Sequence, residues 1–174
     1  MKNLNKVSVI ILTYKTPQKI IHNCLKSIDK RVNILIIENS NKFEHKNYIK
    51  SKFPKTKFFN TGENLGYGRG NNFGLKKTKT DYALILNPDV VCHKNFFKNL
   101  SALLKNDINF DIIGCQYSKD KIFIPAGFFE AKKNENFKRE FFKTKSNKLT
   151  KVDWVTGCSM LINLKKFKKK DIFD

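Results

Sequence analysis

The chain has 174 residues, 40% of them hydrophobic and 13% aromatic, which fits one folded domain and excludes an intrinsically disordered protein. Its formal net charge of +20 comes almost entirely from lysine, with arginine only at Arg31, Arg69 and Arg139. The shortage of arginine disfavours a nucleic-acid reader. Enrichment in Lys, Asn, Ile and Phe favours a compositional bias with solvated lysine surfaces. Attraction to an anionic membrane or a phosphate-bearing substrate is the second interpretation.

Neither the cysteines nor the histidines show the spacing of a metal site or a disulfide framework. The four cysteines are far apart and include no C-x-x-C pair, and the three histidines are equally scattered. No apolar run approaches the roughly 20 residues needed to span a bilayer, and MKNLNK leads into a strand without a signal-peptide core. We therefore expect a reduced protein in the cytoplasm.

The first predicted elements are a strand and a helix. VSVIILT, at residues 7–13, is an apolar run rich in β-branched residues, typical of a strand buried on both faces. Thr16 and Pro17 then form a predicted cap and first turn. Apolar residues follow at helical spacing, namely Ile20, Ile21, Cys24, Leu25 and Ile28.

The same alternation continues along the chain. Strands are predicted at NILIIEN (33–39), KFFNT (57–61) and DYALILNPDV (81–90), and helices at residues 46–52, 71–79 and 93–106. This order predicts an α/β fold with a mostly parallel central sheet and helices on both faces. After Gly114 the pattern weakens into shorter pieces, with a predicted mobile loop at 131–151. We expect a single domain over residues 1–174.

Polar residues follow the carboxyl ends of the predicted strands, where open α/β sheets bind ligands. The positions are Thr13-Tyr14, Glu38-Asn39, the glycine stretch and Asn87-Pro88-Asp89. Asp89 there can hold a divalent cation against a diphosphate. Alternatively, it can cap the following helix, and the spacing alone slightly favours this second interpretation. Glu38 can accept hydrogen bonds from a ribose or base, or simply end a strand.

The glycine stretch, NTGENLGYGRGNNFGL at residues 60–75, narrowly misses the dinucleotide-binding fingerprint G-x-G-x-x-G. Its glycines alternate at Gly66, Gly68 and Gly70, and the next is Gly74. The stretch also follows the third predicted strand rather than the first. Both features disfavour an NAD-dependent enzyme.

Five blocks in order, VSVIILTY, LIIENS, NLGYGRGNNFGL, YALILNPDV and VDWVTGCSMLI, resemble the family 2 glycosyltransferases, especially their bacterial rhamnosyltransferase-like branch. The resemblance covers most of residues 7–174. It implies the GT-A nucleotide-diphospho-sugar transferase fold, and inverting transfer of a sugar to a hydroxyl acceptor in cell-surface polysaccharide synthesis. It also implies Mg²⁺ or Mn²⁺ as cofactor and a saccharide or lipid-linked saccharide acceptor. The basic surface would suit peripheral contact with the inner face of the membrane, and the shortage of arginine disfavours a nucleic acid as partner.

The resemblance also implies roles for individual residues. Residues of the nucleotide-sugar site would be Thr13, Tyr14, Glu38, Asn64, Gly66, Arg69, Asn72, Asn87 and Asp89. Glu38 departs from the family, whose members usually carry Asp there, and Arg69 either reaches the diphosphate or lies in solvent. Asp89 would be the metal ligand, in the place of the family's D-x-D motif. Trp154 and Gly157 would border the acceptor, although core packing is an equal alternative for Trp154.

The catalytic base is not assigned. Family members usually follow the W-x-x-G block with F-D-E-x-F-F and then an E-D pair whose Asp is the base. This sequence stops at KKKDIFD, so Asp174 matches the first Asp of that segment and the base would lie beyond it. We expect a chain truncated at its C-terminal end, as a fragment of a longer product. The alternative is a shortened relative that binds the donor without efficient transfer. A basic nucleic-acid binder is a less favoured third possibility.

Overall fold

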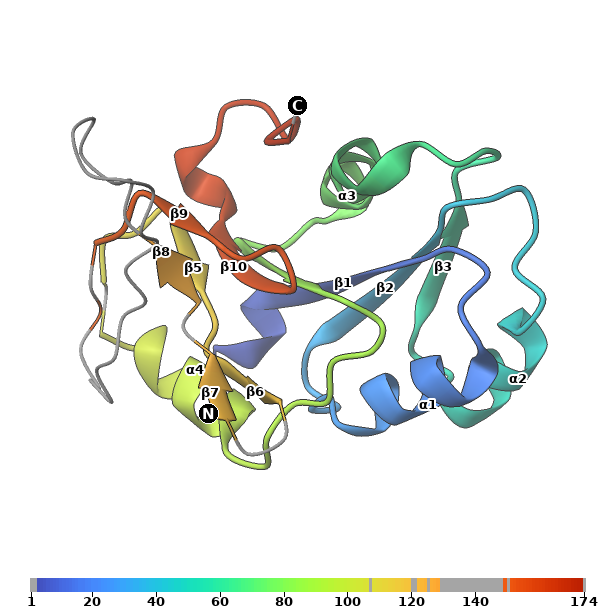
Figure 1. The fold of residues 1–174 in the computed structure, drawn as a ribbon, viewed down its shortest axis with the longest axis horizontal. Helices are drawn as coiled ribbons and strands as arrows, with labels where there is room; N and C mark the ends of the chain where they lie inside the picture. The colour runs from blue at the N-terminus through green and yellow to red at the C-terminus, as the bar shows by residue number, and fades with distance from the viewer. Residues whose placement is uncertain are drawn as a thin grey trace.

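The computed structural model describes residues 3–106, 108–119, 122–124, 126–128, 149 and 151–173. Its centre is a six-stranded sheet with the order β3-β2-β1-β4-β10-β5 (Figure 1). The strands are β1 (Val7–Thr13), β2 (Asn33–Glu38), β3 (Lys57–Asn60), β4 (Tyr82–Leu86), β5 (Ile112–Gly114) and β10 (Ser159–Asn163). Strands β1 to β4 are parallel, whereas β10 is antiparallel to both of its neighbours. The prediction of a mostly parallel central sheet is confirmed.

Helices cover both faces of this sheet, as predicted. Helices α1 (Gln18–Lys26), α2 (Lys46–Lys52) and α4 (Phe96–Leu103) lie on one face, and α3 (Gly66–Lys77) lies on the other (Figure 1). Right-handed crossovers explain this arrangement. The chain runs one way across the sheet from β1 to β3, which puts α1 and α2 on one face, and it returns the other way from β3 to β4, which puts α3 on the opposite face.

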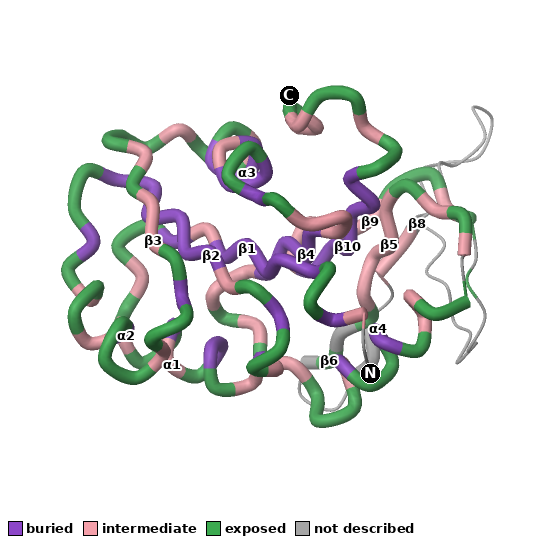
Figure 2. Tube along the Cα trace, turned by 180° about the vertical axis from the view of Figure 1, so that it is seen from behind, coloured by how far each residue is buried: buried purple, intermediate pink, exposed green. Residues whose placement is uncertain are grey.

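The hydrophobic core lies on both faces of the central strand β1. Val9 and Ile11 belong to the cluster under α1, α2 and α4, whereas Ile10 belongs to the cluster under α3. All three side chains are fully buried, which explains why β1 reads as a continuous apolar run rather than an alternating one. Figure 2 shows the buried residues concentrated along the strands.

The remaining elements are short. They are the 3₁₀ helices η1 (Leu4–Lys6) and η2 (Leu164–Lys166), the antiparallel pair β6 (Tyr117–Lys119) and β7 (Ile122–Ile124), and the antiparallel pair β8 (Gly127–Phe128) and β9 (Trp154–Val155). The predicted loop at 131–151 lies almost entirely outside the described residues. None of the helices in the described part of the chain has the length and apolar content needed to cross a bilayer.

Several predicted boundaries differ from the structure, and three of the differences bear on the site. Helix α3 begins at Gly66 rather than near residue 71, so most of the glycine stretch is helical. Helix α1 begins at Gln18, and Thr16 makes no cap, because its hydroxyl oxygen instead accepts a hydrogen bond from the Tyr14 amide at 3.3 Å. Strand β4 ends at Leu86, so Asn87-Pro88-Asp89 forms a turn after it.

Candidate functional site

The polar strand ends meet at one edge of the sheet, as predicted. Thr13 and Glu38 are register partners on the adjacent parallel strands β1 and β2. Beyond β2, the Asn39 amide donates a 2.7 Å hydrogen bond to the Thr13 carbonyl. On the other side, the Asn87 amide donates a 2.9 Å bond to the Cys158 carbonyl, just before β10. We call this the carboxyl edge, because strands β1, β2 and β4 all end there.

The Glu38 carboxylate lies inside this edge rather than on its surface. Only 2% of the residue is exposed, and its oxygens accept hydrogen bonds from the Thr13 hydroxyl at 2.7 Å, the Ser40 hydroxyl at 2.8 Å and the Lys15 amide at 3.2 Å. A buried carboxylate is tolerable because of these donors. Glu38 therefore joins the ends of β1 and β2 to the loop that follows β1. A ligand would add a hydrogen bond to this set or replace one member.

Asn39 connects β2 to the start of α3, a role that the sequence did not reveal. Its side-chain amide donates to the Asn64 side-chain oxygen at 2.9 Å and to the Gly66 carbonyl at 3.2 Å. Its oxygen accepts from the Leu65 amide at 3.0 Å. The Asn64 oxygen also accepts from the Gly66 amide at 3.0 Å. The only available signal was its position directly after the strand. Asn39 and Asn64 thus fix the first turn of α3 beside the carboxyl edge.

Two glycines, Gly70 and Gly74, explain why α3 approaches the sheet so closely, and a third, Gly66, begins the helix. A Cβ on Gly70 would lie 2.7 Å from a Leu12 methyl carbon, and one on Gly74 would lie 2.7 Å from Ile10 Cγ2. Gly66 has φ of +75°, a conformation that other residues rarely adopt. The sequence disfavoured a dinucleotide-binding loop here, and the family resemblance assigned only Gly66 to the nucleotide-sugar site. The structure instead uses Gly70 and Gly74 for helix–sheet contact.

Asp89 is exposed in the turn after β4. It is not the cap of the next helix, because Asn95 occupies that position in α4. No group of three or more His, Cys, Asp or Glu side chains suited to a metal is present among the described residues. Any cation at Asp89 would therefore take most of its ligands from a bound diphosphate and from water, as Mg²⁺ commonly does.

Tyr14 and Arg69 also lie at this edge with exposed side chains. Tyr14 is 48% exposed, and the Lys15 ammonium lies 5.4 Å from the centre of its ring. The Arg69 side chain donates from Nε to the Leu65 carbonyl at 3.2 Å. In this structure Arg69 is held against its own helix, and its outer guanidinium nitrogens remain available for an anion.

Gly157, one of the two predicted acceptor-side residues, meets α3 through Tyr67, another residue that the sequence did not single out. The Tyr67 hydroxyl donates a short hydrogen bond to the Gly157 carbonyl. Burial, with a smaller contribution from Cys158, raises the pKa of Tyr67 to about 12, so the phenol stays protonated as a donor. Trp154 lies in β9 and is 40% exposed, which excludes plain core packing. Asp174 lies outside the described residues.

Asn72 faces a different part of the chain. Its side chain is 5% exposed and hydrogen-bonds the backbone of Ile172 and Phe173. The resemblance placed Asn72 in the wall of the nucleotide-sugar site. In the structure its amide makes three hydrogen bonds to these backbone groups, so any effect on a ligand would be indirect.

Comparison with known proteins identifies the family. The sequence profile described as "Glycosyl transferase family 2" matches residues 8–169. The chain belongs to this family. The prediction of family 2 membership is confirmed.

A curated relative and several solved structures resemble this family 2 glycosyltransferase. The low-salt glycan biosynthesis hexosyltransferase Agl10 of Haloferax volcanii is 26% identical over 114 residues, which cover 63% of this chain and 36% of the relative. The crystal structure of S. aureus TarS 1–349 in complex with UDP-GlcNAc has a TM-score of 0.64 at 17% identity, covering 96% of this chain and 48% of that one. The mannosyltransferase PcManGT from Pyrobaculum calidifontis, in complex with GDP-Man and Mn²⁺, has a TM-score of 0.52 at 14% identity, covering 63% and 35%. These neighbours confirm the GT-A fold, and the chain spans about half or less of their lengths.

Two thiols of this family 2 member, those of Cys24 and Cys92, are unsuited to nucleophilic chemistry. Burial raises the pKa of Cys24 to about 12 and that of Cys92 to about 11, and the other cysteines also have free thiols. A thiol with a raised pKa is rarely ionised near neutrality and is a poor nucleophile. The Cys24 thiol, at 3.8 Å from the Asn87 carbonyl, instead packs beneath the turn that carries Asp89.

Proposed function

We propose that this chain binds a nucleotide-diphosphate sugar at the carboxyl edge and transfers the sugar to a hydroxyl acceptor in bacterial cell-surface polysaccharide synthesis. The observation that carries the proposal is the convergence at one edge of Glu38, Asn39 and the turn ending at Asp89. Family membership and the donors named for the solved neighbours, UDP-GlcNAc and GDP-Man, support it.

The donor half of the site would be formed by β1, β2 and the first turn of α3. The exposed ring of Tyr14 offers a face for the base. Glu38 holds the backbone beneath it and has room for a further hydrogen bond from a ribose or base, because a carboxylate has about four acceptor positions. Arg69 would turn its free guanidinium nitrogens toward the diphosphate. Asn64 and Gly66 shape the wall beside it.

The residues present fit a divalent cation that arrives with the donor. Asp89 supplies one exposed carboxylate after β4, and Asn87 lies in the same turn. One or two carboxylates plus substrate phosphate oxygens is the usual arrangement for Mg²⁺. Bound there, Mg²⁺ or Mn²⁺ would stabilise the departing nucleoside diphosphate as a Lewis acid. The relative PcManGT was solved with Mn²⁺, which supports this part of the proposal.

The acceptor would enter on the side of β9 and the turn before β10. Trp154 is partly exposed there, and the hydrogen bond from Tyr67 to Gly157 joins this side to the first turn of α3. The hydroxyl of the acceptor would displace the nucleotide with inversion, and a carboxylate would take its proton. Holding the two reactants in line would supply much of the rate enhancement.

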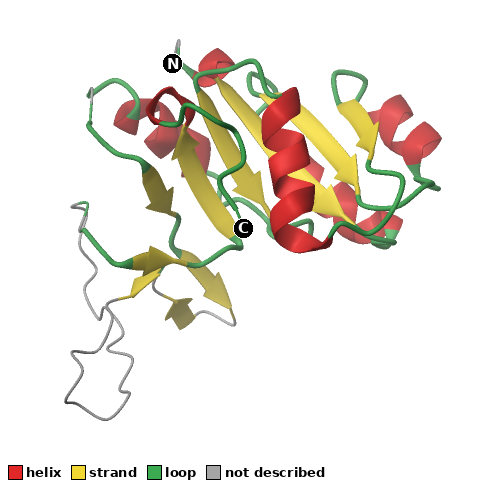
Figure 3. Cartoon of the chain, turned by 90° about the horizontal axis from the view of Figure 1, so that it is seen from above, coloured by secondary structure: helices red, strands yellow, loops and turns green. Residues whose placement is uncertain are grey.

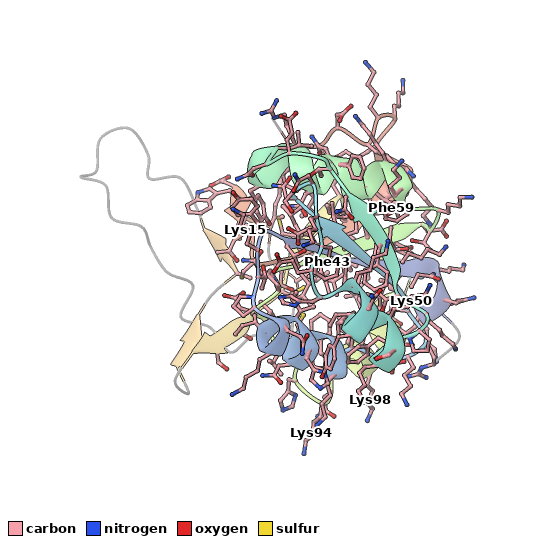
Figure 4. All side chains as sticks on the ribbon, turned by 90° about the vertical axis from the view of Figure 1, so that its right-hand side faces the viewer. Lys15, Phe43, Lys50, Phe59, Lys94 and Lys98 are labelled. Atoms are coloured by element: carbon pink, nitrogen blue, oxygen red, sulfur yellow. The ribbon has the colours of Figure 1, made fainter. Side chains whose placement is uncertain are left out.

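We place the protein in the cytoplasm, with peripheral contact at the inner face of the membrane. Exposed lysines such as Lys94 and Lys98 extend from the surface near α4 (Figure 4). Lysine attracts anionic lipid surfaces without needing a specific geometry. A lipid-linked saccharide acceptor would suit this location.

Thermal unfolding with a panel of UDP, dTDP and GDP sugars, each with and without Mn²⁺, tests the proposal. A ligand that binds only the folded state raises the unfolding temperature, so at least one donor should stabilise the protein in a Mn²⁺-dependent way. A panel without any stabilisation would argue strongly against the proposed function.

A donor-binding domain without efficient transfer is the second candidate, because the chain spans only about half or less of its solved relatives. It predicts the same stabilisation by donors but no sugar transfer by this chain. Transfer that appears when the segment following residue 174 in the gene is added would reject it for the full-length protein.

A further inference from the structure

The last described residues form a segment that lies along α3. We call residues 170–173 the C-terminal strap. The Lys170 ammonium donates to the Thr78 carbonyl just past the end of α3, and Asp171 forms a 2.6 Å ion pair with Lys76. Figure 3 shows the C-terminal segment running beside this helix.

Asn72 holds the strap by its main chain. Its Oδ1 accepts hydrogen bonds from the Ile172 amide at 2.9 Å and the Phe173 amide at 3.1 Å. Its Nδ2 donates to the Phe173 carbonyl at 2.6 Å. One buried side chain thus satisfies three backbone groups that are a hundred residues away in sequence. Because the bonds are to main chain, they fix the path of the strap whatever its side chains are.

The strap runs toward the carboxyl edge. Along the strap, the successive contacts are with Thr78, Lys76, Asn72 and finally Tyr67. The ring centres of Tyr67 and Phe173 lie 6.2 Å apart in an edge-to-face arrangement. Tyr67 lies in the first turn of α3, which Asn39 ties to the end of β2. The Tyr67 hydroxyl also reaches Gly157 on the acceptor side. The strap therefore ends where the donor and acceptor halves of the edge meet.

We propose that Asn72 is a positioning residue, which clamps the strap to α3 so that Phe173 and Tyr67 form the wall between the two halves of the site. The clamp itself needs no ligand. Its consequence for catalysis rests on the proposed function, because a displaced strap would leave this wall open. Loss of the clamp should disturb the strap and this wall while leaving the sheet intact.

Hydrogen exchange at individual amides, without ligand, tests the clamp. In Asn72→Ala the amides of Ile172 and Phe173 lose their acceptor and should exchange roughly a hundred-fold faster. Amides of β1 and β4 should be unchanged. The matched control is Lys76→Ala, which removes only an exposed ion pair and should change the same two rates by less than about five-fold. Unchanged exchange in Asn72→Ala, or equally faster exchange throughout the sheet, would overturn the proposal.

The conservative variant Asn72→Asp adds a signature that a general packing role would not produce. A carboxylate still accepts from both amides but cannot donate to the Phe173 carbonyl until it is protonated. After correction for intrinsic rates, protection of Ile172 and Phe173 should be weaker than in the wild type at pH 7 and should recover as the pH falls to 4. The other charged groups at the strap, Lys76, Lys170 and Asp171, are the same in the wild type, whose pH profile is the reference. Equal protection of both proteins at pH 7 would contradict the clamp.

A ligand experiment then tests the wall. UDP-GlcNAc or GDP-mannose, each with Mn²⁺, should slow amide exchange at Phe173 several-fold in the wild type. The same ligand should bind less tightly to Asn72→Ala, because a ligand that stabilises the clamped strap binds more weakly when the clamp is lost. Binding without any change at Phe173 would overturn the assignment of the wall. If neither sugar nucleotide binds while Asn72 still controls exchange at the strap, the proposed function fails and the clamp stands.

Discussion

The hydroxyl of Thr13 donates a 2.7 Å hydrogen bond to the carboxylate of Glu38 across two adjacent parallel strands. Both residues are almost completely buried, with exposed fractions of 1% and 2%. The carboxyl edge of the sheet is therefore held together by a polar contact inside the protein, beneath the surface on which a ligand would lie.

Replacing Thr13 by Val should destabilise the fold. The substitution keeps the shape of the side chain but removes a donor from a buried carboxylate, at a cost of about 1–3 kcal/mol. Urea unfolding measures this change. The control is Thr16→Val. Thr16 is only half-buried, so its replacement should change the free energy of unfolding by less than about 0.5 kcal/mol. Similar stabilities of the two variants would show that the Glu38 contact contributes little.

Asp89→Ala should abolish the Mn²⁺-dependent stabilisation by a donor without harming the fold. Asp89 is exposed, so the free energy of unfolding without ligand should change by less than about 0.5 kcal/mol. Thermal unfolding with and without donor and Mn²⁺ measures both effects. Asp111→Ala is the matched control, because Asp111 is exposed just before β5, at the opposite edge of the sheet. Retained metal-dependent stabilisation in Asp89→Ala would remove Asp89 from the proposed site.

Gly74→Ala should be more destabilising than Gly70→Ala, although both substitutions favour a helix by roughly 1 kcal/mol. The new Cβ at position 74 would lie 2.7 Å from Ile10 Cγ2 and 3.0 Å from Ile37 Cγ1, atoms of stiff β-branched side chains in the core. At position 70 it would meet the terminal methyl carbons of Leu12, which can rotate away. We expect a net loss of about 1–3 kcal/mol for Gly74→Ala and little change for Gly70→Ala in chemical unfolding. The reverse order would contradict the packing described here.

Alkaline pH should destabilise the fold through its buried thiols. Burial raises the pKa of Cys24 from the ordinary value of 9.0 to about 12 and that of Cys92 to about 11. These thiols therefore lose their protons at a lower pH in the unfolded chain than in the folded protein. Their contribution to stability is complete below about pH 9 and is lost as the pH rises through 11 to 12.

Urea unfolding from pH 8 to pH 10.5 measures the effect. Cys24→Ala removes one of the two ionising groups, so its stability should fall less steeply with pH than that of the wild type. Parallel curves for the two proteins would show that Cys24 does not ionise differently in the folded and unfolded states.

Much of the parallel half of the fold could be predicted from the sequence. The buried strands β1 and β2 read as continuous apolar runs because both of their faces are covered, and the polar residues after them had to meet at one edge. The position of Thr13, Glu38 and Asn87 at this edge could therefore be predicted from the sequence. The start of α3 was not found, because four glycines in nine positions disfavour a helix locally. Close contact with the sheet outweighs this local preference.

The roles of Asn72 and Tyr67 were beyond the reach of sequence patterns. Each depends on a partner about ninety or a hundred residues away, Gly157 for Tyr67 and Phe173 for Asn72. No periodicity or spacing records such a contact. Only the folded chain shows that α3 contacts these two distant segments.

The antiparallel direction of β10 has a consequence for how relatives with the same core can diverge. On the proposed donor side, β1 and β2 end at the carboxyl edge, and the chain then continues into the crossover helices. On the other side, the antiparallel strand β10 begins at this edge, directly after a short turn. Residues inserted into a crossover must still return across the sheet, but residues inserted before Ser159 only lengthen a turn. Evolution, or an engineer, can therefore vary the residues on the proposed acceptor side while the proposed nucleotide site stays unchanged.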